Sequence, residues 1–440
     1  MGNPAINYTG AAGLTATEHR LDNGLRLVLS EDHLNPVVAV CLWYEVGSRY
    51  EVQGRTGLAH LFEHLMFQGS AQVKGNGHFE LVQSAGGSLN GTTSFERTNY
   101  FETMPAHQLE LALWLEADRM GSLLAALDEE SLQNQRDVVK NERRQRTENR
   151  PAGLISKVLL EALYPPAHPY YHEVIGSMED LTAASVEDVQ AFFRTFYAPG
   201  NATLVIAGDF DRAKTKELVE QYFGPIPAGG PVPRRSTPEV KLSPAKRIAM
   251  EAKVQQPQLY VAYPSPASFA PGDRELDLLA NVLANGKSSR LYKRLVYDMK
   301  IAQSVSASQQ SQLLGSDFEI MASPMPGHSL DEILAVIDQE IAAIQDKPVD
   351  EAELERAKNQ IESDTVRSLE GLHARAERLQ VYNLSLGDPG FLAEDLKRYR
   401  AVDAAALSRV AREVLRKDGR VVVTIAPNPE APIMGRVVSK

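Results

Sequence analysis

A stretch rich in proline and glycine divides the chain into two nearly equal parts. It runs from Phe223 to Pro244, FGPIPAGGPVPRRSTPEVKLSP, and shows no hydrophobic periodicity. This composition is typical of an exposed interdomain linker, and 440 residues are more than one hydrophobic core usually serves. The sequence therefore predicts an N-terminal domain at 15–224, a linker at 225–244 and a C-terminal domain at 245–432.

Each part repeats one plan of strands and helices. The first part starts with expected strands at Leu25–Asp32 and Val37–Val46 and then a helix. The second starts with RIAMEAK, QLYVAYPS and a helix at Leu276–Asn285. A long charged helix follows in both parts, and both end with a helix and a strand. Strands mixed with several helices favour the α+β class. We therefore expect two homologous αβ domains, each a largely antiparallel sheet packed with helices.

Composition and charge exclude several functions. A net charge of -11 argues against a nucleic-acid binder, whose surface would be basic. Cys41 is the only cysteine, which excludes intrachain disulfides and favours a buried structural thiol. No stretch is apolar enough for a membrane span. The N-terminus lacks the regions of a signal peptide, so we expect a cytoplasmic protein, or a periplasmic one if this is a mature form.

The segment Gly57–Ser70, GLAHLFEHLMFQGS, places two histidines and a glutamate in an apolar run. On a helix, His60 and His64 share a face and can aim both imidazoles at one metal ion. Two neutral imidazoles suit zinc, and a catalytic zinc needs a third protein ligand and a bound water. Glu63 borders the same face, where a carboxylate can take the proton of that water and pass it to a leaving amine.

A buried helix whose histidines make local hydrogen bonds is the alternative, because short motifs match often. Here the neighbours of the three residues are apolar, and a buried carboxylate with two imidazoles needs partners. One metal ion would supply them all, so the pattern favours a metal site.

The third ligand is expected on a helix within Ser131–Pro151. One stripe of this helix continues at Glu142, and its earlier members are Leu132, Gln135, Val138 and Val139. Arg136 and the neighbouring basic residues are expected to point elsewhere. Glu142 is thus a carboxylate on the inward face, although a surface glutamate paired with a nearby arginine is the commoner situation. Glu148 and Asp137 fit the stripe less well.

A second histidine pair, His168 and His172 in HPYYH, has the same spacing. Pro169 disfavours a helix there, so we expect both histidines in a loop.

His60-x-x-Glu63-His64, followed by Glu142 in VVKNERRQRTENRP, resembles the inverzincins, the insulinase, pitrilysin and mitochondrial processing peptidase group of zinc metallopeptidases. The resemblance extends from LDNGLRLVLSED through SRLYKRL to the last strand, and the size resembles the processing-peptidase-type bacterial members. It implies one zinc ion per chain, held by His60, His64 and Glu142, with Glu63 as the general base. It also implies a clamshell of two or more such units, which encloses peptides or unfolded chains.

The resemblance also implies how a substrate is bound. The segment Gly86–Glu102 is similar to the family's strand beside the zinc, where the substrate adds as an extra strand, with Asn90 near the scissile bond. Family members often carry a glutamate seven residues before the third ligand. Gln135 stands there instead, and we expect it to tune the metal from outside the set of ligands without adding charge.

Active family members carry an arginine and a tyrosine, seven residues apart in the C-terminal half, which bind substrate and stabilise the developing oxyanion. In SSRLYKRLVYDMKIAQSV the corresponding positions are Val296 and Gln303. Tyr292 and Tyr297 are nearby but out of register. The resemblance therefore implies a heterodimer with a homologous subunit that lacks zinc and carries the Arg/Tyr pair, with a homodimer as the alternative.

Two other functions compete with a peptidase. A non-catalytic scaffold subunit of a larger assembly usually loses part of the zinc motif, whereas all four residues of the motif are present here. A structural zinc usually has four protein ligands, often cysteines, and this sequence offers three. We therefore predict a zinc-dependent endopeptidase subunit that hydrolyses peptides or unfolded chains.

Overall fold

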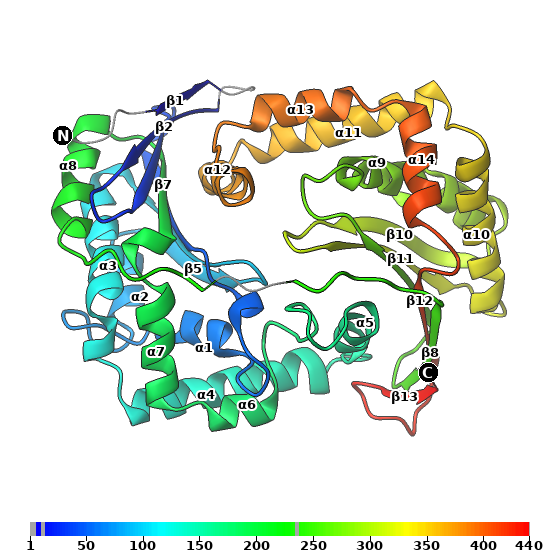
Figure 1. Cartoon of the computed structure of the whole chain (residues 1–440), viewed down its shortest axis with the longest axis horizontal. Coiled ribbons are helices and arrows are strands. Elements are labelled where there is room, and N and C mark those ends of the chain that lie inside the picture. Colours follow the sequence, from blue (N-terminus) through cyan, green and yellow to red (C-terminus); the bar gives the residue numbers. More distant parts are fainter. Residues whose placement is uncertain (1–5, 10–13, 234–236, 440) are drawn as a thin grey trace. The chain divides into compact units, whose positions relative to one another are not determined.

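The computed structural model describes residues 6–9, 14–233 and 237–439. They form two compact units, each a sheet packed with helices (Figure 1). Each unit gathers described residues from three stretches of the chain. Unit 1 takes them from Met1–Asn141, Glu173–Ser236 and Thr365–Asp395, and unit 2 from Glu142–His172, Thr237–Asp364 and Leu396–Lys440.

Unit 1 contains a seven-stranded sheet in the order β1-β2-β3-β7-β4-β6-β5. Its strands are β1 (Ile6–Thr9), β2 (Thr15–Arg20), β3 (Arg26–Glu31), β4 (Val37–Tyr44), β5 (Ser88–Thr93), β6 (Thr98–Pro105) and β7 (Ala202–Gly208). Neighbouring strands are antiparallel except β3 and β7, which are parallel. Strand β5 lies at one edge, so one side of its backbone has no neighbouring strand within the described ranges.

Unit 2 contains a six-stranded sheet in the order β10-β11-β9-β12-β8-β13. Its strands are β8 (Lys246–Ala252), β9 (Gln258–Ser265), β10 (Ala302–Gln310), β11 (Ser316–Pro324), β12 (Val421–Pro427) and β13 (Arg436–Ser439). Only β8 and β12 are parallel among its neighbouring strands. The order β8-β12-β9-β11-β10 reproduces β3-β7-β4-β6-β5, with the parallel pair at the same place. The predicted α+β class with two sheet-and-helix domains is confirmed.

Each unit also contains helices, several of which pack on its sheet. In unit 1 they are α1 (Leu58–Leu65), α2 (Gly77–Ser84), α3 (Leu109–Ser122), α6 (Met178–Ala183), α7 (Val186–Phe196), α8 (Arg212–Phe223) and α12 (Leu372–Leu386). In unit 2 they are α5 (Ile155–Leu163), α9 (Asp273–Ala284), α10 (Leu330–Asp346) and α14 (Ala404–Val414). The division between the units falls within α4 (Glu129–Arg143), α11 (Glu351–Ser368) and α13 (Leu392–Arg400).

Strand β4, VVAVCLWY, is buried on both faces because helices cover each of them. Side chains alternate along a strand, and one set joins the hydrophobic core formed with α1, α3 and α7; this set is Val38, Val40, Leu42 and Tyr44. The other set includes Cys41 and Trp43 and faces α12, which contacts β4, β6 and β7. A fully buried leucine or valine contributes about 1.5–3 kcal/mol, so both faces contribute to the stability of the sheet.

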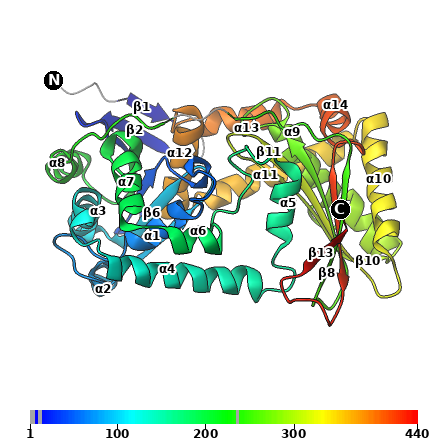
Figure 2. The same ribbon diagram turned by 60° about the horizontal axis from the view of Figure 1, so that its bottom comes forward.

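The compact units are not continuous in sequence. Helix α12 comes from the later part of the chain and packs in unit 1, whereas α5 comes from the earlier part and packs on β9 and β12 in unit 2, opposite α10 (Figure 2). The continuous boundaries 15–224 and 245–432 stay a prediction. Residues 234–236 of the predicted linker lie outside the described residues, and the rest of 225–244 forms neither helix nor strand.

In the described part of the chain, every helix falls short of the length or apolarity that crossing a membrane requires.

Candidate metal centre

The start of α1 is fixed by a glycine and a carboxylate. Gly57 precedes the helix with a φ of 87°, and a Cβ there would lie 2.7 Å from the carbonyl oxygen of Ile175. The backbone N–H groups of Gly57 and Ala59 donate to the carboxylate of Glu51 at 2.8 and 2.7 Å. A negative charge at a helix N-terminus is stabilising, so these contacts set where the helix begins and how it is oriented.

Helix α1 brings His60, Glu63 and His64 together, and we call them the His–Glu–His cluster. One ligand atom from each lies within 4.8 Å of the others, and the two imidazole ring centres are 4.9 Å apart. His60 is buried, whereas Glu63 and His64 are half-buried, so one side of the cluster is open. Two imidazole nitrogens suit a divalent metal such as zinc, and the neighbouring carboxylate is placed to act on a metal-bound water.

The edge strand β5 lies directly beside Glu63. The hydroxyl of Thr93 donates to Glu63 Oε2 at 2.6 Å. A Cβ at Gly91 would lie 3.2 Å from Glu63 Cγ and from the rings of Phe67 and Tyr100. Any larger residue at position 91 would therefore press on the side chain of Glu63.

Asn90 is exposed on the same strand, and its Oδ1 accepts a hydrogen bond from the N–H of Gly91 at 2.9 Å. Because side chains alternate along a strand, Asn90 faces away from the side on which Gly91 and Thr93 meet Glu63. The predicted segment Gly86–Glu102 proves to be the hairpin of β5 and β6. A role of Asn90 near the scissile bond stays a prediction.

Helix α4 carries Glu142 and Gln135, although one detail of its predicted stripe is wrong. Val138 is 41% exposed, and Arg136 is buried in its place. The guanidinium of Arg136 donates to the carbonyl oxygen of Ala184 at 2.7 Å, which keeps its long side chain inward. Gln135 is buried, as its place in the stripe predicts.

Glu142 is half-buried and forms an ion pair with Arg146 at 2.8 Å. It belongs to unit 2, one residue beyond the division after Asn141, whereas the histidines belong to unit 1. Its role as the third metal ligand stays a prediction.

Two other predictions concern residues of unit 2. His168 and His172 lie in the loop after α5, as predicted, and His168 stacks on Tyr164 with ring centres 4.5 Å apart. Val296 is half-buried in the short π-helical segment Tyr292–Asp298 and packs against the core of unit 2. Gln303 is exposed at an irregularity of β10.

Unit 1 contains a buried polar network that was not predicted from the sequence. His78 Nε2 lies 2.7 Å from Glu102 Oε1, and Glu116 forms a two-bond ion pair with Arg119. Burial lowers the pKa of His78 to about 3 and raises that of Glu102 to about 7. The Arg119 guanidinium also lies 4.2 Å from the ring centre of Tyr100. Because Arg119 supplies the positive charge, we interpret the network as structural.

We expect Arg119→Met to destabilise unit 1 by about 3–5 kcal/mol, because it leaves the buried carboxylate of Glu116 without its cation. Chemical denaturation followed by the tyrosine and tryptophan fluorescence measures this loss. Arg194→Met, on the exposed face of α7, is the matched control and should leave the midpoint unchanged. Equal midpoints for both variants would contradict the structural interpretation.

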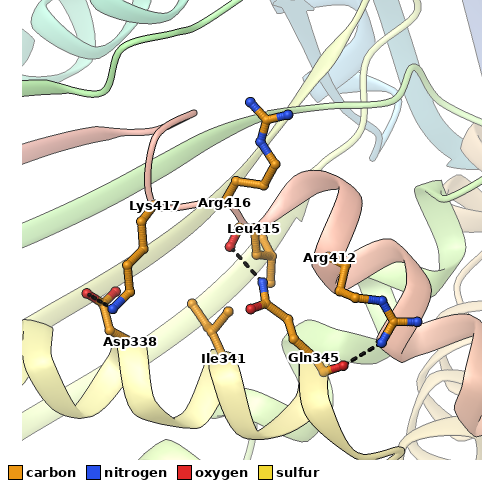
Figure 3. Close-up of a pocket in the computed structure, with 7 residues that line it drawn as sticks. All are labelled: Asp338, Ile341, Gln345, Arg412, Leu415, Arg416 and Lys417. Carbon is orange, nitrogen blue, oxygen red and sulfur yellow. Dashed lines mark hydrogen bonds and ion pairs between the residues drawn. The ribbon is translucent and has the colours of Figure 1, made fainter.

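A pocket in unit 2, between α10 and α14, is lined by several basic residues. Its polar side chains already bond to other groups of the protein (Figure 3). Gln345 donates to the carbonyl oxygens of Ala411 and Leu415 at 3.0 and 3.1 Å, and Arg412 donates to the carbonyl oxygen of Gln345. Lys417 pairs with Asp338 at 3.3 Å. These bonds satisfy helix-end carbonyls, so we assign the pocket a structural role.

Comparisons with known proteins match the two parts of the chain separately and as a whole. The family model described as "Insulinase (Peptidase family M16)" matches residues 26–168, and "Peptidase M16 inactive domain" matches residues 183–361. "Zinc protease PqqE" from Helicobacter pylori is 30% identical over 419 residues, which cover 92% of each chain. "Probable mitochondrial-processing peptidase subunit beta, mitochondrial" from Arabidopsis thaliana is 25% identical, and the match covers 95% of this chain and 80% of that one.

The fold is similar to solved structures as well. The crystal structure of a protease from Helicobacter pylori has a TM-score of 0.88 and 28% identity, covering 94% of this chain and 100% of the other. The family models and the relatives thus belong to one class of peptidase. The chain belongs to peptidase family M16, the family of insulinase, and the resemblance predicted from the sequence is confirmed.

Proposed function

We propose that the chain is the zinc-binding subunit of an endopeptidase that hydrolyses peptides or unfolded chains. The observation that supports this most directly is the His–Glu–His cluster, whose ligand atoms lie within 4.8 Å of one another beside a sheet edge. In this proposal His60, His64 and Glu142 hold one catalytic zinc ion per chain. When bound, zinc supplies a Lewis acid and activates water as a nucleophile. The name of the Helicobacter pylori relative, a zinc protease, supports the choice of metal.

Glu63 acts as the general base of the proposed reaction. Its carboxylate accepts the proton of the attacking water and returns a proton to the leaving amine, as such carboxylates do. The hydroxyl of Thr93 donates to one carboxylate oxygen and restricts its rotation. The hydrogen atom at Gly91 in place of a side chain leaves the carboxylate room beside β5.

Strand β5 provides the place for the substrate. Its outer edge carries backbone groups without a strand partner in the described part of unit 1, and an extended peptide can add there through backbone hydrogen bonds. Such pairing needs a substrate whose own backbone is free, which favours peptides and unfolded chains over folded proteins. Asn90 is exposed on this strand and is proposed to contact the substrate near the scissile bond.

A partner is proposed to complete the site. Val296 and Gln303 occupy the positions where active family members carry the Arg/Tyr pair, and a packed valine cannot stabilise an oxyanion. We infer that a homologous subunit without zinc supplies the pair in a heterodimer, with a homodimer as the alternative. The Arabidopsis thaliana relative is itself described as a subunit, the beta subunit of a processing peptidase.

The test is cleavage of a mixed, unstructured peptide library by the purified chain. We expect slow cleavage that a chelator abolishes and added zinc restores. A homologous subunit with the Arg/Tyr pair should accelerate it by about 100–1000-fold, the usual contribution of oxyanion donors. Cleavage that persists without metal would refute the zinc mechanism. A full rate from the chain alone would refute the need for a heterologous partner, and no cleavage with a partner present would favour a scaffold subunit.

A further inference from the structure

A second group of metal-ligand side chains lies in unit 1, on the face of the sheet opposite the core that α1 packs on. One ligand atom each from Cys41, His373 and Glu377 lies within 4.8 Å of the others, and we call these residues the thiol cluster. Cys41 comes from β4, whereas His373 and Glu377 are one turn apart on α12 and share a helix face. No local sequence pattern indicates the cluster, because more than 300 residues separate the cysteine from its neighbours.

We propose that the thiol cluster is a second metal site, which binds a thiophilic divalent cation such as Zn²⁺. Thiolate, imidazole and carboxylate are the three ligand types of zinc sites, and a water can complete a tetrahedron. Zinc–ligand bonds of 2.0–2.3 Å place tetrahedral ligands about 3.3–3.6 Å from one another. Cys41 Sγ already lies 3.3 Å from Glu377 Oε1, so this pair needs no rearrangement.

His373 provides an independent indication of a ligand. Its Nδ1 atom is buried and has no hydrogen-bond partner in the described structure, although buried polar atoms are generally paired. Its ring is held in place by stacking on Phe101, with ring centres 4.0 Å apart. A metal ion at the cluster would give the imidazole the partner that the surrounding side chains do not provide.

Neighbouring donors orient Glu377 for this role. Trp43 Nε1 and Asn99 Nδ2 donate to Glu377 Oε1 at 3.2 and 2.8 Å. Hydrogen bonds of this kind fix ligating carboxylates in metal sites. His373 and Glu377 are half-buried, so a cation can reach the cluster although Cys41 itself is fully buried.

The same geometry disfavours a reactive cysteine. Burial, reinforced by the nearby carboxylate, raises the pKa of the Cys41 thiol well above its ordinary value. A catalytic thiol needs the opposite shift, and the Cys41 thiol donates to Glu377 and not to His373. Arg97 lies close enough to interact electrostatically with Glu377. Because that positive charge opposes any cation, we expect selection for metals that bond strongly to sulfur, and exclusion of Mg²⁺ and Ca²⁺.

A bound metal would fasten α12 to the sheet at a defined position. Cys41 pairs with Phe101 on β6, and Phe101 pairs with Asn90 on β5, so the site lies in the same cross-strand row as the exposed edge. Two strand spacings, about 10 Å, separate Cys41 from that edge. The site would therefore stabilise the part of the sheet that is proposed to receive substrate.

The experiment uses the full chain, stripped of metal and titrated with Co²⁺. A thiolate bound to Co²⁺ gives a near-ultraviolet charge-transfer absorption, and Cys41 is the only cysteine that can produce it. We expect this absorption to appear and then to disappear when Zn²⁺ displaces Co²⁺, as the relative affinities of the two ions require. The absorption does not depend on peptidase activity. The experiment therefore tests the thiol cluster separately from the proposed function.

Variants distinguish the site from adventitious binding to a thiol. Cys41→Ser should abolish the absorption. His373→Phe keeps a ring on Phe101 and should raise the Co²⁺ concentration for half-saturation by more than about tenfold. His19→Phe, on β2, is the matched control and should leave it unchanged. No absorption in the unsubstituted chain with a reduced thiol would overturn the proposal, and so would an absorption that His373→Phe leaves unchanged.

Discussion

Glu63→Gln is expected to reduce kcat/KM for peptide cleavage by about 100–10,000-fold while the chain keeps its zinc. General acid–base groups contribute a factor of this size, and glutamine cannot accept the proton of the attacking water. The amide preserves the shape of the carboxylate, and its oxygen can still accept the hydrogen bond from Thr93. Steady-state cleavage and metal content of the same preparation measure the two properties separately.

The matched control is Glu80→Gln, an exposed glutamate on α2, which should leave cleavage unchanged. Loss of zinc together with activity in Glu63→Gln would instead identify Glu63 as a metal ligand. Normal cleavage by Glu63→Gln would refute its role as the base, and with it the proposed mechanism.

Local patterns were enough to predict many of the elements. The strand QLYVAYPS is β9, Gln258–Ser265, and the repeat of strands and helices is visible in the two matching sheet orders. These features depend on hydrophobic periodicity and turn residues within short stretches. The His–Glu–His cluster was predictable for the same reason, because its three residues lie close together on one helix.

Features that depend on long-range packing were not predictable. Nothing in the local pattern indicates that α12 covers Cys41 and Trp43, since the partners are far apart in sequence. Arginine is usually a surface residue, and the burial of Arg136 depends in part on a hydrogen bond to the carbonyl oxygen of Ala184, which is distant in sequence. The contact between Gly91 and Glu63 likewise exists only after β5 has paired with β6 and α1 has packed beside it.

The identity of the third metal ligand can be tested directly at Glu142. Glu142 is either a metal ligand or a glutamate paired with Arg146 that binds no metal. We expect Glu142→Gln to lower zinc affinity by more than about 100-fold and to abolish cleavage, because loss of a ligand exceeds the 10–100-fold cost of losing an outer partner. Zinc binding by calorimetry, with cleavage at saturating zinc, measures both effects.

Arg146→Met is the decisive control because it removes the other half of the ion pair and leaves the carboxylate intact. A surface ion pair contributes little, so this variant should keep its zinc and its activity. If Glu142→Gln keeps its zinc and activity as Arg146→Met does, Glu142 is not a metal ligand. Glu148→Gln then becomes the next variant to test. If only Glu142→Gln loses zinc, the carboxylate of Glu142 is a metal ligand and not merely the partner of Arg146.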